Sequence, residues 1–244
     1  DPRTKLFGTL VFIVSLFFAN SIACYVAATL FLVTAIRMSK VPFSFMVRGL
    51  KAILFLLLIS VSFNLFLTPG TPVVQFGIFK ITQEGIRTAG FMALRLIYLV
   101  IGSSVMTLTT TPNELTDGLE KSLGFLNKAG VPVHEISMMM SIALRFIPIL
   151  VEETDKIMKA QMARGADFES GNLLQKAKSM VPLLVPLFIS AFRRATDLAM
   201  AMEARCYHGG EGRTKMKPLK YAKRDHVGYL VYVIYLMIVI LLRA

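Results

Sequence analysis

The longest stretch without a charged residue, from Leu6 to Ile36, restricts the fold of this chain more than any other feature. A helix needs about 20 apolar residues to cross the hydrocarbon core of a bilayer, and this stretch is well beyond that length. Asn20 and Ser21 interrupt it near the middle, and both residues favour turns. We therefore expect two short membrane helices folded back on each other, with one long tilted helix as the alternative.

Three further apolar segments approach or exceed the length of a membrane helix. They are Ala52–Leu67, Gly85–Thr110 and His226–Leu242. The chain is 55% hydrophobic and only 17% charged, whereas soluble domains are nearer a quarter charged. We therefore predict an all-α integral membrane protein, with short transmembrane helices and long amphipathic helices on the cytoplasmic side.

The charged residues divide the chain into three regions. Outside residues 111–225, the acidic residues are Asp1 and Glu84 alone. Apolar residues nevertheless stay dense in 111–225, which is typical of amphipathic helices. We expect N-terminal transmembrane helices in 1–110, a cytoplasmic or interfacial region of coupling helices in 111–225, and a final transmembrane helix in 226–244.

The basic residues indicate which side of the membrane each loop faces. The chain carries a net charge of +12, and cytoplasmic loops of membrane proteins collect lysine and arginine. The loop with Arg37, Lys40, Arg48 and Lys51 and the basic linker 209–224 should therefore lie inside. The lipid bilayer then explains the charge better than nucleic acid does, and we exclude nucleic acid as a partner.

Two details of the membrane part carry separate expectations. Arg95 lies within an apolar segment, where an unpaired arginine costs at least about 2.5 kcal/mol. We favour an arginine that faces the protein interior over one that lines an ion pathway. Residues 68–72 predict a turn on the outer side, and Val73–Thr82 a short extended or interfacial piece.

Two long helical patterns dominate the middle region. Thr111–Glu114 has the residues of a helix start, which we expect to run to about Leu126. His134–Arg164 follows with three-to-four apolar spacing and should end at Gly165. Leu173–Arg205 repeats the design as one helix, bent by prolines. Its expected apolar stripe consists of Val181, Leu184, Phe188, Ala195, Ala199 and Met202.

The sequence contains no motif that predicts catalysis. His134, His208 and His226 lie far apart, and no zinc-protease, nucleophile-elbow or phosphate-loop motif is present. The acidic run at residues 152–155 is more typical of a solvated face than of a metal site. We therefore predict a protein that is not an enzyme and that has no cofactor, no metal site and no catalytic residue. Any nucleotide would sit on a partner.

The specific signal is a small residue, an arginine and a second small residue at the end of each long helix. These triplets are Ala163-Arg164-Gly165 and Ala204-Arg205-Cys206. The helix dipole favours one arginine in a last turn, but two such ends are harder to explain by capping alone. Small neighbours allow a helix end to enter a narrow groove, where the guanidinium fork can bind carboxylates or carbonyls. We expect both triplets to dock other proteins.

These features together resemble the transmembrane T component of energy-coupling factor transporters, which are importers of the ATP-binding-cassette type for vitamins and metals. The opening residues Asp1-Pro2-Arg3-Thr4-Lys5 are similar to the family's Asp-Pro-Arg-x-Lys stretch. The two triplets fall at the family's two x-Arg-x motifs, with Cys206 where glycine or alanine is common. The order of short spans, long helices and a final span covers the whole chain.

The resemblance implies a multi-pass coupling subunit in the cell membrane of a prokaryote. Arg164 and Arg205 would each enter a groove on one of two ATPase subunits, where ATP is hydrolysed. The apolar faces of the long helices would hold one separate substrate-binding membrane subunit for vitamin uptake. The methionines expected at that contact are Met138, Met139, Met140, Met158 and Met162. From the residues alone, a place in the buried core is an equal alternative for them.

Other classes of membrane protein stay open at this point. A conventional ATP-binding-cassette permease would carry a longer coupling loop, of which Glu203, Ala204 and Gly209 are only a fragment. A secondary transporter would need polar residues at the membrane midplane, and Arg95 and Asn64 are the only candidates. A membrane scaffold without a transport role is the third alternative.

Overall fold

The computed structural model describes residues 1–76, 79–168, 172–210, 216 and 218–243. The chain forms two compact units, residues 1–118 with 219–244, and residues 119–218. Helices dominate the described residues of both units, which confirms the predicted α-helical membrane protein. A two-stranded hairpin in the first unit is the exception.

Within the described ranges, five helices are long and apolar enough to cross a membrane. They are α2 (Ile22–Ser39), α3 (Phe43–Leu67), α4 (Gln83–Thr109), α6 (Val133–Ala163) and α9 (Lys223–Arg243). The first four spans expected from the sequence correspond to α1 (Pro2–Phe18), α2, α3 and α4, and the last to α9. The long amphipathic α6 also reaches this length and hydropathy because its first half is strongly apolar.

The apolar stretch at the start of the chain forms two helices, as expected. Helix α1 ends at Phe18 and α2 begins at Ile22. The hydroxyl of Ser21 accepts a hydrogen bond from the amide of Ala23 at 3.2 Å and so caps α2. The chain then turns again before Phe43, where Pro42 precedes α3.

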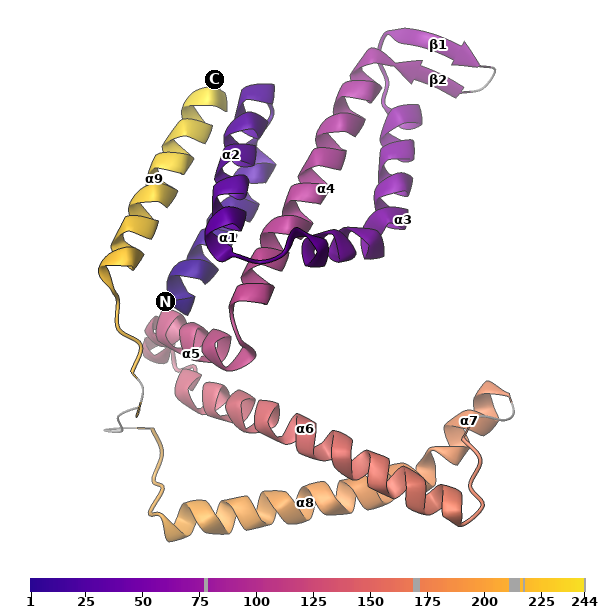
Figure 1. Ribbon diagram of the computed structural model, residues 1–244, viewed down its shortest axis with the longest axis vertical. Coiled ribbons are helices and arrows are strands. Elements are labelled where there is room, and N and C mark those ends of the chain that lie inside the picture. The colour runs from indigo at the N-terminus through magenta and orange to yellow at the C-terminus, as the bar shows by residue number, and fades with distance from the viewer. Residues whose placement is uncertain (77–78, 169–171, 211–215, 217, 244) are drawn as a thin grey trace. The chain divides into compact units, whose positions relative to one another are not determined.

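The segment between α3 and α4 is a short antiparallel hairpin. Strands β1 (Pro72–Phe76) and β2 (Phe79–Thr82) pair with a register shift near Pro72, in line with the extended piece expected there. The hydroxyl of Thr82 accepts from the amide of Gly85 at 3.0 Å and donates to the carbonyl of Thr68 at 2.9 Å. This one side chain therefore joins the start of α4 to the end of α3, and the two helices run side by side (Figure 1).

The core of the first unit lies among α1, α2, α4 and α9. Leu16, Cys24 and Ala28 are almost completely buried there. The hydroxyls of Ser15 and Tyr235 lie 2.7 Å apart, which links α1 to α9 inside this core. Gly8 faces Tyr232, and a methyl group at Gly8 would overlap the tyrosine ring. The last helix of the chain therefore packs against the first two.

Arg95 faces the protein interior in the first unit, as expected. A terminal nitrogen of its guanidinium, Nη2, donates to the carbonyl of Ala19 at 3.3 Å, and the guanidinium carbon lies 5.6 Å from the centre of the Phe17 ring. Ala19 follows the last residue of α1. Arg95 therefore satisfies one of the free carbonyls at the end of that helix, where a positive charge also complements the helix dipole.

Helix α5 (Pro112–Leu123) begins in the first unit and ends in the second. The amide of Thr111 donates to the carboxylate of Glu114 at 3.0 Å, and the amide of Glu114 donates to the hydroxyl of Thr111 at 3.3 Å. This reciprocal pair is a capping box, as the residues at 111–114 predicted. The helix stops at Leu123 rather than near Leu126, because a 3-10 helix, η1 (Gly124–Ala129), takes over.

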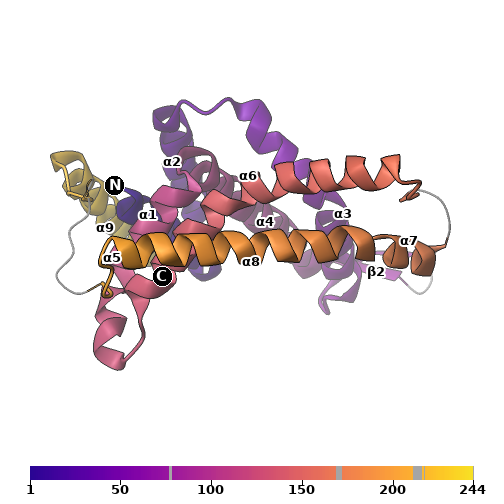
Figure 2. The same cartoon turned by 90° about the horizontal axis from the view of Figure 1, so that it is seen from below.

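The second unit consists mainly of α6 and α8 (Val181–Ala204), which pack against each other (Figure 2). The prediction of one continuous helix over Leu173–Arg205 is wrong. The segment forms α7 (Leu173–Ser179) and α8, which are separated at Met180. The break comes just before Pro182. Proline has no backbone N–H to donate, and its ring clashes with the carbonyl one turn earlier, so a helix cannot continue undisturbed through this position. In contrast, α6 continues through its internal Pro148.

Candidate functional site

Both predicted arginine triplets lie at helix ends, in the same structural position. Helix α6 ends at Ala163 and α8 at Ala204, so Arg164 and Arg205 are the capping residues directly after each helix. Their backbones are nearly identical, with φ and ψ of -90° and 5° at Arg164 and -95° and 14° at Arg205. We call the two ends the Arg164 tip and the Arg205 tip.

The Arg164 tip ends in a Schellman motif. The amide of Ala166 donates to the carbonyl of Gln161 at 3.0 Å, and the amide of Gly165 to the carbonyl of Met162 at 2.9 Å. These bonds satisfy carbonyls that the end of a helix leaves free, and they require a left-handed residue after the cap. Gly165 is that residue, with φ +90°, which glycine adopts without steric cost.

The Arg205 tip has the same motif with a different residue at the key position. The amide of Tyr207 donates to the carbonyl of Met202 at 3.1 Å, and the amide of Cys206 to the carbonyl of Glu203 at 2.9 Å. Cys206 takes the left-handed conformation, with φ +54°. A residue with a Cβ pays roughly 1–2 kcal/mol for this conformation.

The guanidinium groups of both tips are exposed and, among the residues that the structure describes, free of side-chain partners. Arg164, Arg205 and their small neighbours are all exposed. Within the part of the chain that the structure describes, neither guanidinium forms an ion pair or a side-chain hydrogen bond. Each tip therefore presents an unused planar fork of donors, a geometry that matches carboxylates and pairs of carbonyl groups.

The two tips lie at opposite ends of an antiparallel helix pair. The side-chain amide of Gln161 donates to the carbonyl of Pro182 at 3.2 Å, near the Arg164 tip. Arg194 of α8 pairs with Glu153 of α6 at 3.3 Å in between. Helix α8 has 24 residues, which corresponds to about 36 Å at the rise of an α-helix. The pair can therefore present its two arginines to two separate partner surfaces (Figure 2).

The Arg205 tip is tied to the beginning of α6. The hydroxyl of Tyr207 donates to the sulfur of Met138 at 3.1 Å. Gly210 lies directly against the His134 ring, where no side chain would fit. His134 Nδ1 lies 3.0 Å from a carboxylate oxygen of Glu120, and the other oxygen accepts from the hydroxyl of Ser137 at 2.8 Å. These contacts anchor the segment that follows Arg205.

Sequence reasoning did not predict this anchor, and it gave no role to Glu120, Ser137, Tyr207 or Gly210. His134 and Ser137 are three residues apart and share one face of α6, but Glu120 belongs to α5. Nothing in the order of the residues indicates that α5 lies beside that face. The first turn of α6 therefore has a carboxylate partner from another helix.

A large apolar surface of the second unit is uncovered in the single chain. Phe192 is 71% exposed and Met139 60%. The residues that share this exposure are Ile136, Met140, Ile147 and Val151 on α6 and Val185, Phe188 and Ile189 on α8. A soluble monomer rarely leaves such a surface open.

The predicted apolar stripe of α8 does not pack against α6. All of its members except Met202 are exposed. The half-buried residues of α8 include Leu187, Ala191 and Leu198, which share a face of the helix with Arg194, the partner of Glu153 on α6. The spacing of apolar residues in the sequence identified an apolar face of α8, but it does not indicate which element covers that face.

The five methionines singled out in the sequence divide into two groups. Met139, Met140 and Met162 are exposed, and Met138 and Met158 are half-buried. None belongs to a buried core. Met138 contacts Tyr207 as part of the anchor of the Arg205 tip.

The opening Asp-Pro-Arg-Thr-Lys stretch has a structural role in the first unit. The carboxylate of Asp1 accepts from the amide of Arg3 at 2.9 Å and pairs with its guanidinium at 2.8 Å. Arg3 also lies over the ring of Tyr221, 3.8 Å from its centre. The amine of Lys5 donates to the carbonyl of Thr109, the last residue of α4, at 2.5 Å. The motif therefore joins the start of α1 to the end of α4 and to the segment before α9.

The acidic and basic groups noted in the sequence are spread over several parts of the chain. Across the described ranges, no group of three or more histidine, cysteine or acidic side chains could hold a metal ion. Glu152 and Asp155 are exposed, and Glu153 pairs with Arg194. Arg213, Lys215 and Lys217 of the predicted basic linker lie outside the residues that the structure describes.

Comparison with known proteins assigns the chain to a family. The family described as cobalt transport protein, CbiQ, matches residues 1–216. A protein of Clostridium kluyveri named energy-coupling factor transporter transmembrane protein EcfT is 55% identical over 100% of this chain and 91% of its own length. Proteins of the same name in Bacillus subtilis and Lactococcus lactis are 47% and 44% identical, over 100% and 99% of the chain and 92% and 91% of theirs. A multi-pass membrane chain with this similarity along its length belongs to the CbiQ family of transport proteins, as a transmembrane T component of the energy-coupling factor type.

Proposed function

We propose that this protein transmits the motion of two ATPase subunits to a separate substrate-binding membrane subunit, and that the assembly imports a micronutrient such as a vitamin. The observation that carries the proposal is the pair of equivalent helix ends, each with an exposed arginine that has no ion pair or side-chain hydrogen bond among the described residues. In this proposal the protein itself is not catalytic, and ATP is hydrolysed on the partners. The names of its relatives, which are components of energy-coupling factor transporters, support this division of labour.

The tips suit docking because of their shape as well as their charge. Ala163 and Gly165 leave Arg164 without bulky neighbours, and Ala204 and Cys206 do the same for Arg205. A groove on an ATPase subunit could therefore accept the helix end up to its last backbone turn. Inside such a groove, a guanidinium forms charge-assisted hydrogen bonds worth about 1.5–3 kcal/mol each.

The antiparallel arrangement explains how one chain could respond to two ATPases. Each tip belongs to a different helix, and the helices contact each other through Glu153 and Arg194. If ATP draws the two ATPases together, the two helices must shift or pivot against each other. The few buried residues of this unit, Val133 and Ser137 in α6 and none in α8, favour such a movement over a rigid contact.

The uncovered apolar surface supports the second half of the proposal. The exposed side chains of α6 and α8 would contact the substrate-binding subunit, with Met139, Met140 and Met162 among them. Methionine adapts its shape easily, which suits a surface that accepts more than one partner. The basic residues of 37–51 and of the linker before α9 favour a cytoplasmic location for the tips.

Reversing the charge of each tip tests the proposal. We expect Arg164→Glu or Arg205→Glu to weaken retention of ATPase subunits during copurification, and the double change to abolish both retention and uptake. Arg193→Glu is the matched control, because Arg193 is exposed on α8 but lies far from its end. Full uptake by the double variant, or an equal loss in the control, would contradict the docking role.

A further inference from the structure

The first unit contains a cavity of about 630 Å³ among α1, α2, α4 and α9. Its size is typical of a small-molecule site. Every residue that lines it belongs to this one compact unit. The proposed coupling function uses none of them, so the cavity requires an explanation of its own.

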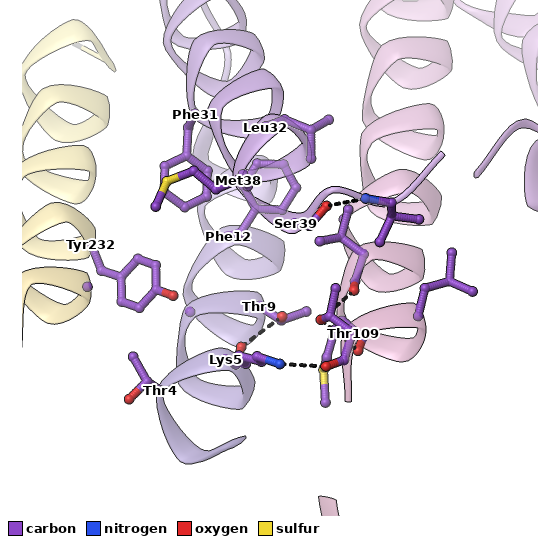
Figure 3. A pocket seen from close by; sticks show the side chains of 18 of the residues that line it. Thr4, Lys5, Thr9, Phe12, Phe31, Leu32, Met38, Ser39, Thr109 and Tyr232 are labelled. Atoms are coloured by element: carbon purple, nitrogen blue, oxygen red, sulfur yellow. Dashed lines mark hydrogen bonds between the residues drawn. The ribbon is translucent and has the colours of Figure 1, made fainter. Parts of the chain in front are cut away.

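The cavity is apolar at one end and polar at the other. Figure 3 shows Phe12, Phe31 and Leu32 gathered at one end, and Lys5, Thr9 and Thr109 at the other. Phe12 and Phe31 stack with ring centres 5.6 Å apart. An occupant that matches both ends must be an amphiphile.

The polar end offers positive charge to an entering molecule. Lys5 and Arg224 line it and are exposed, whereas Asp225 is 6% exposed. The carboxylate of Asp225 already accepts from the hydroxyl of Thr4 at 3.1 Å and from the amide of Ala222 at 2.8 Å. The Thr4–Asp225 bond also joins the first turns of α1 and α9, from which Lys5 and Arg224 both line the cavity.

The two cations are available to a ligand. Lys5 donates to the carbonyl of Thr109 and has two further N–H donors. Among the residues that the structure describes, Arg224 has no acidic partner within ion-pair distance. Asp1, the remaining acidic residue at the mouth, is paired with Arg3.

We propose that this cavity binds one anionic phospholipid, with its phosphate at Lys5 and Arg224 and an acyl chain along Phe12, Phe31 and Leu32. Basic pockets between membrane helices on the cytoplasmic side bind anionic headgroups in this way. The mouth lies where α1 and α9 begin and α2 and α4 end, and the basic loop predicted to face the cytoplasm starts at the end of α2. Free phosphate would leave the apolar end unfilled, so a lipid fits the whole cavity better.

Native mass spectrometry of the full-length protein in its transporter complex tests the proposal. The probes are phosphatidylglycerol and phosphatidylcholine with identical acyl chains, each added to delipidated sample. We expect one phosphatidylglycerol to be retained in preference to phosphatidylcholine. Each lost charge should weaken retention about fivefold, since one basic residue near a membrane surface contributes about that factor.

The variants separate the headgroup contact from the apolar end. Arg224→Gln should reduce the preference for phosphatidylglycerol with little effect on folding, since Arg224 is exposed and forms no hydrogen bond or ion pair among the described residues. Lys5→Gln should reduce this preference further. Ala35→Phe, which fills the cavity from α2, should reduce retention of both lipids. The matched control is Arg48→Gln with Lys51→Gln, two exposed cations of α3 that do not line the cavity.

Three results would overturn the proposal. The first is equal retention of the two lipids by the unchanged protein. The second is unchanged retention in the Arg224→Gln and Lys5→Gln double variant, or an equal loss in the control. The third is thermal stabilisation by inorganic phosphate alone that matches the effect of phosphatidylglycerol. Lipid retention is measured without uptake or ATP. A negative result would therefore contradict the lipid proposal and leave the docking role of the two tips untouched.

Discussion

The Arg164 tip and the Arg205 tip reach the same geometry with different residues. Both place an arginine at the cap and both close with the same two backbone hydrogen bonds. The left-handed position is Gly165 in one and Cys206 in the other. Beyond it, Tyr207 and Gly210 anchor the Arg205 tip to the start of α6. The two tips therefore share the geometry of the cap. The Arg205 tip, in which Cys206 has a strained backbone, has additional contacts that stabilise it.

Among changes that keep the charge of the tips, the largest expected effect comes from replacing each arginine by lysine. Arg164→Lys and Arg205→Lys keep the charge but remove the planar fork. We expect each to weaken ATPase retention about 10-fold to 100-fold, the equivalent of roughly 1.5–3 kcal/mol for a charge-assisted hydrogen bond. The loss of ATPase retention can be measured by copurification at increasing concentrations of the ATPase subunits. Equal losses would support equivalent tips, whereas wild-type binding in both variants would argue against a fork-specific contact.

The next effect tests the small neighbours of the arginines. Ala163→Leu and Ala204→Leu should hinder entry into a close-fitting groove, with a cost of about 1–3 kcal/mol from overpacking. The same copurification measures it. Ala160→Leu and Ala201→Leu are matched controls, because these exposed alanines lie one turn further from each helix end. Losses that are no greater at the tips than in the controls would show that the end itself does not enter a groove.

A smaller effect of opposite sign is expected at the two left-handed positions. Gly165→Ala should destabilise the Arg164 tip by about 1 kcal/mol, and Cys206→Gly should stabilise the Arg205 tip by a similar amount. Hydrogen exchange at the amides of Ala166 and Tyr207, which close the two motifs, should change about fivefold in opposite directions. The same sign in both variants would contradict the strain assigned to Cys206.

The smallest effect concerns the anchor of the Arg205 tip. Tyr207→Phe removes the hydroxyl that contacts Met138, which should cost about 0.5–1 kcal/mol. Hydrogen exchange should then rise at Tyr207 and stay unchanged at Ala166. A parallel rise at both amides would mean that the two tips unfold together and that the anchor is not specific to one of them.

Most of the helices could be predicted from the sequence because their signals are local. The break at Ser21, the start at Thr111 and the stop at Gly165 depend on neighbouring residues alone. The helix over Leu173–Arg205 was predicted without its break at Met180, because apolar periodicity continues across Pro182. The anchor around Glu120 could not be predicted, since it joins residues of two helices whose packing no local pattern encodes.

The sequence by itself determined that the chain is a helical membrane protein, and it identified both arginine triplets and the family they indicate. Tertiary structure alone decided that α6 and α8 run antiparallel, so that Arg164 and Arg205 lie at opposite ends of one pair. It also decided that side chains on the apolar faces of these helices are exposed and that α1, α2, α4 and α9 line an open cavity. The physical reason is that periodicity reports which face of a helix is apolar, whereas the choice of what covers that face depends on contacts between distant segments.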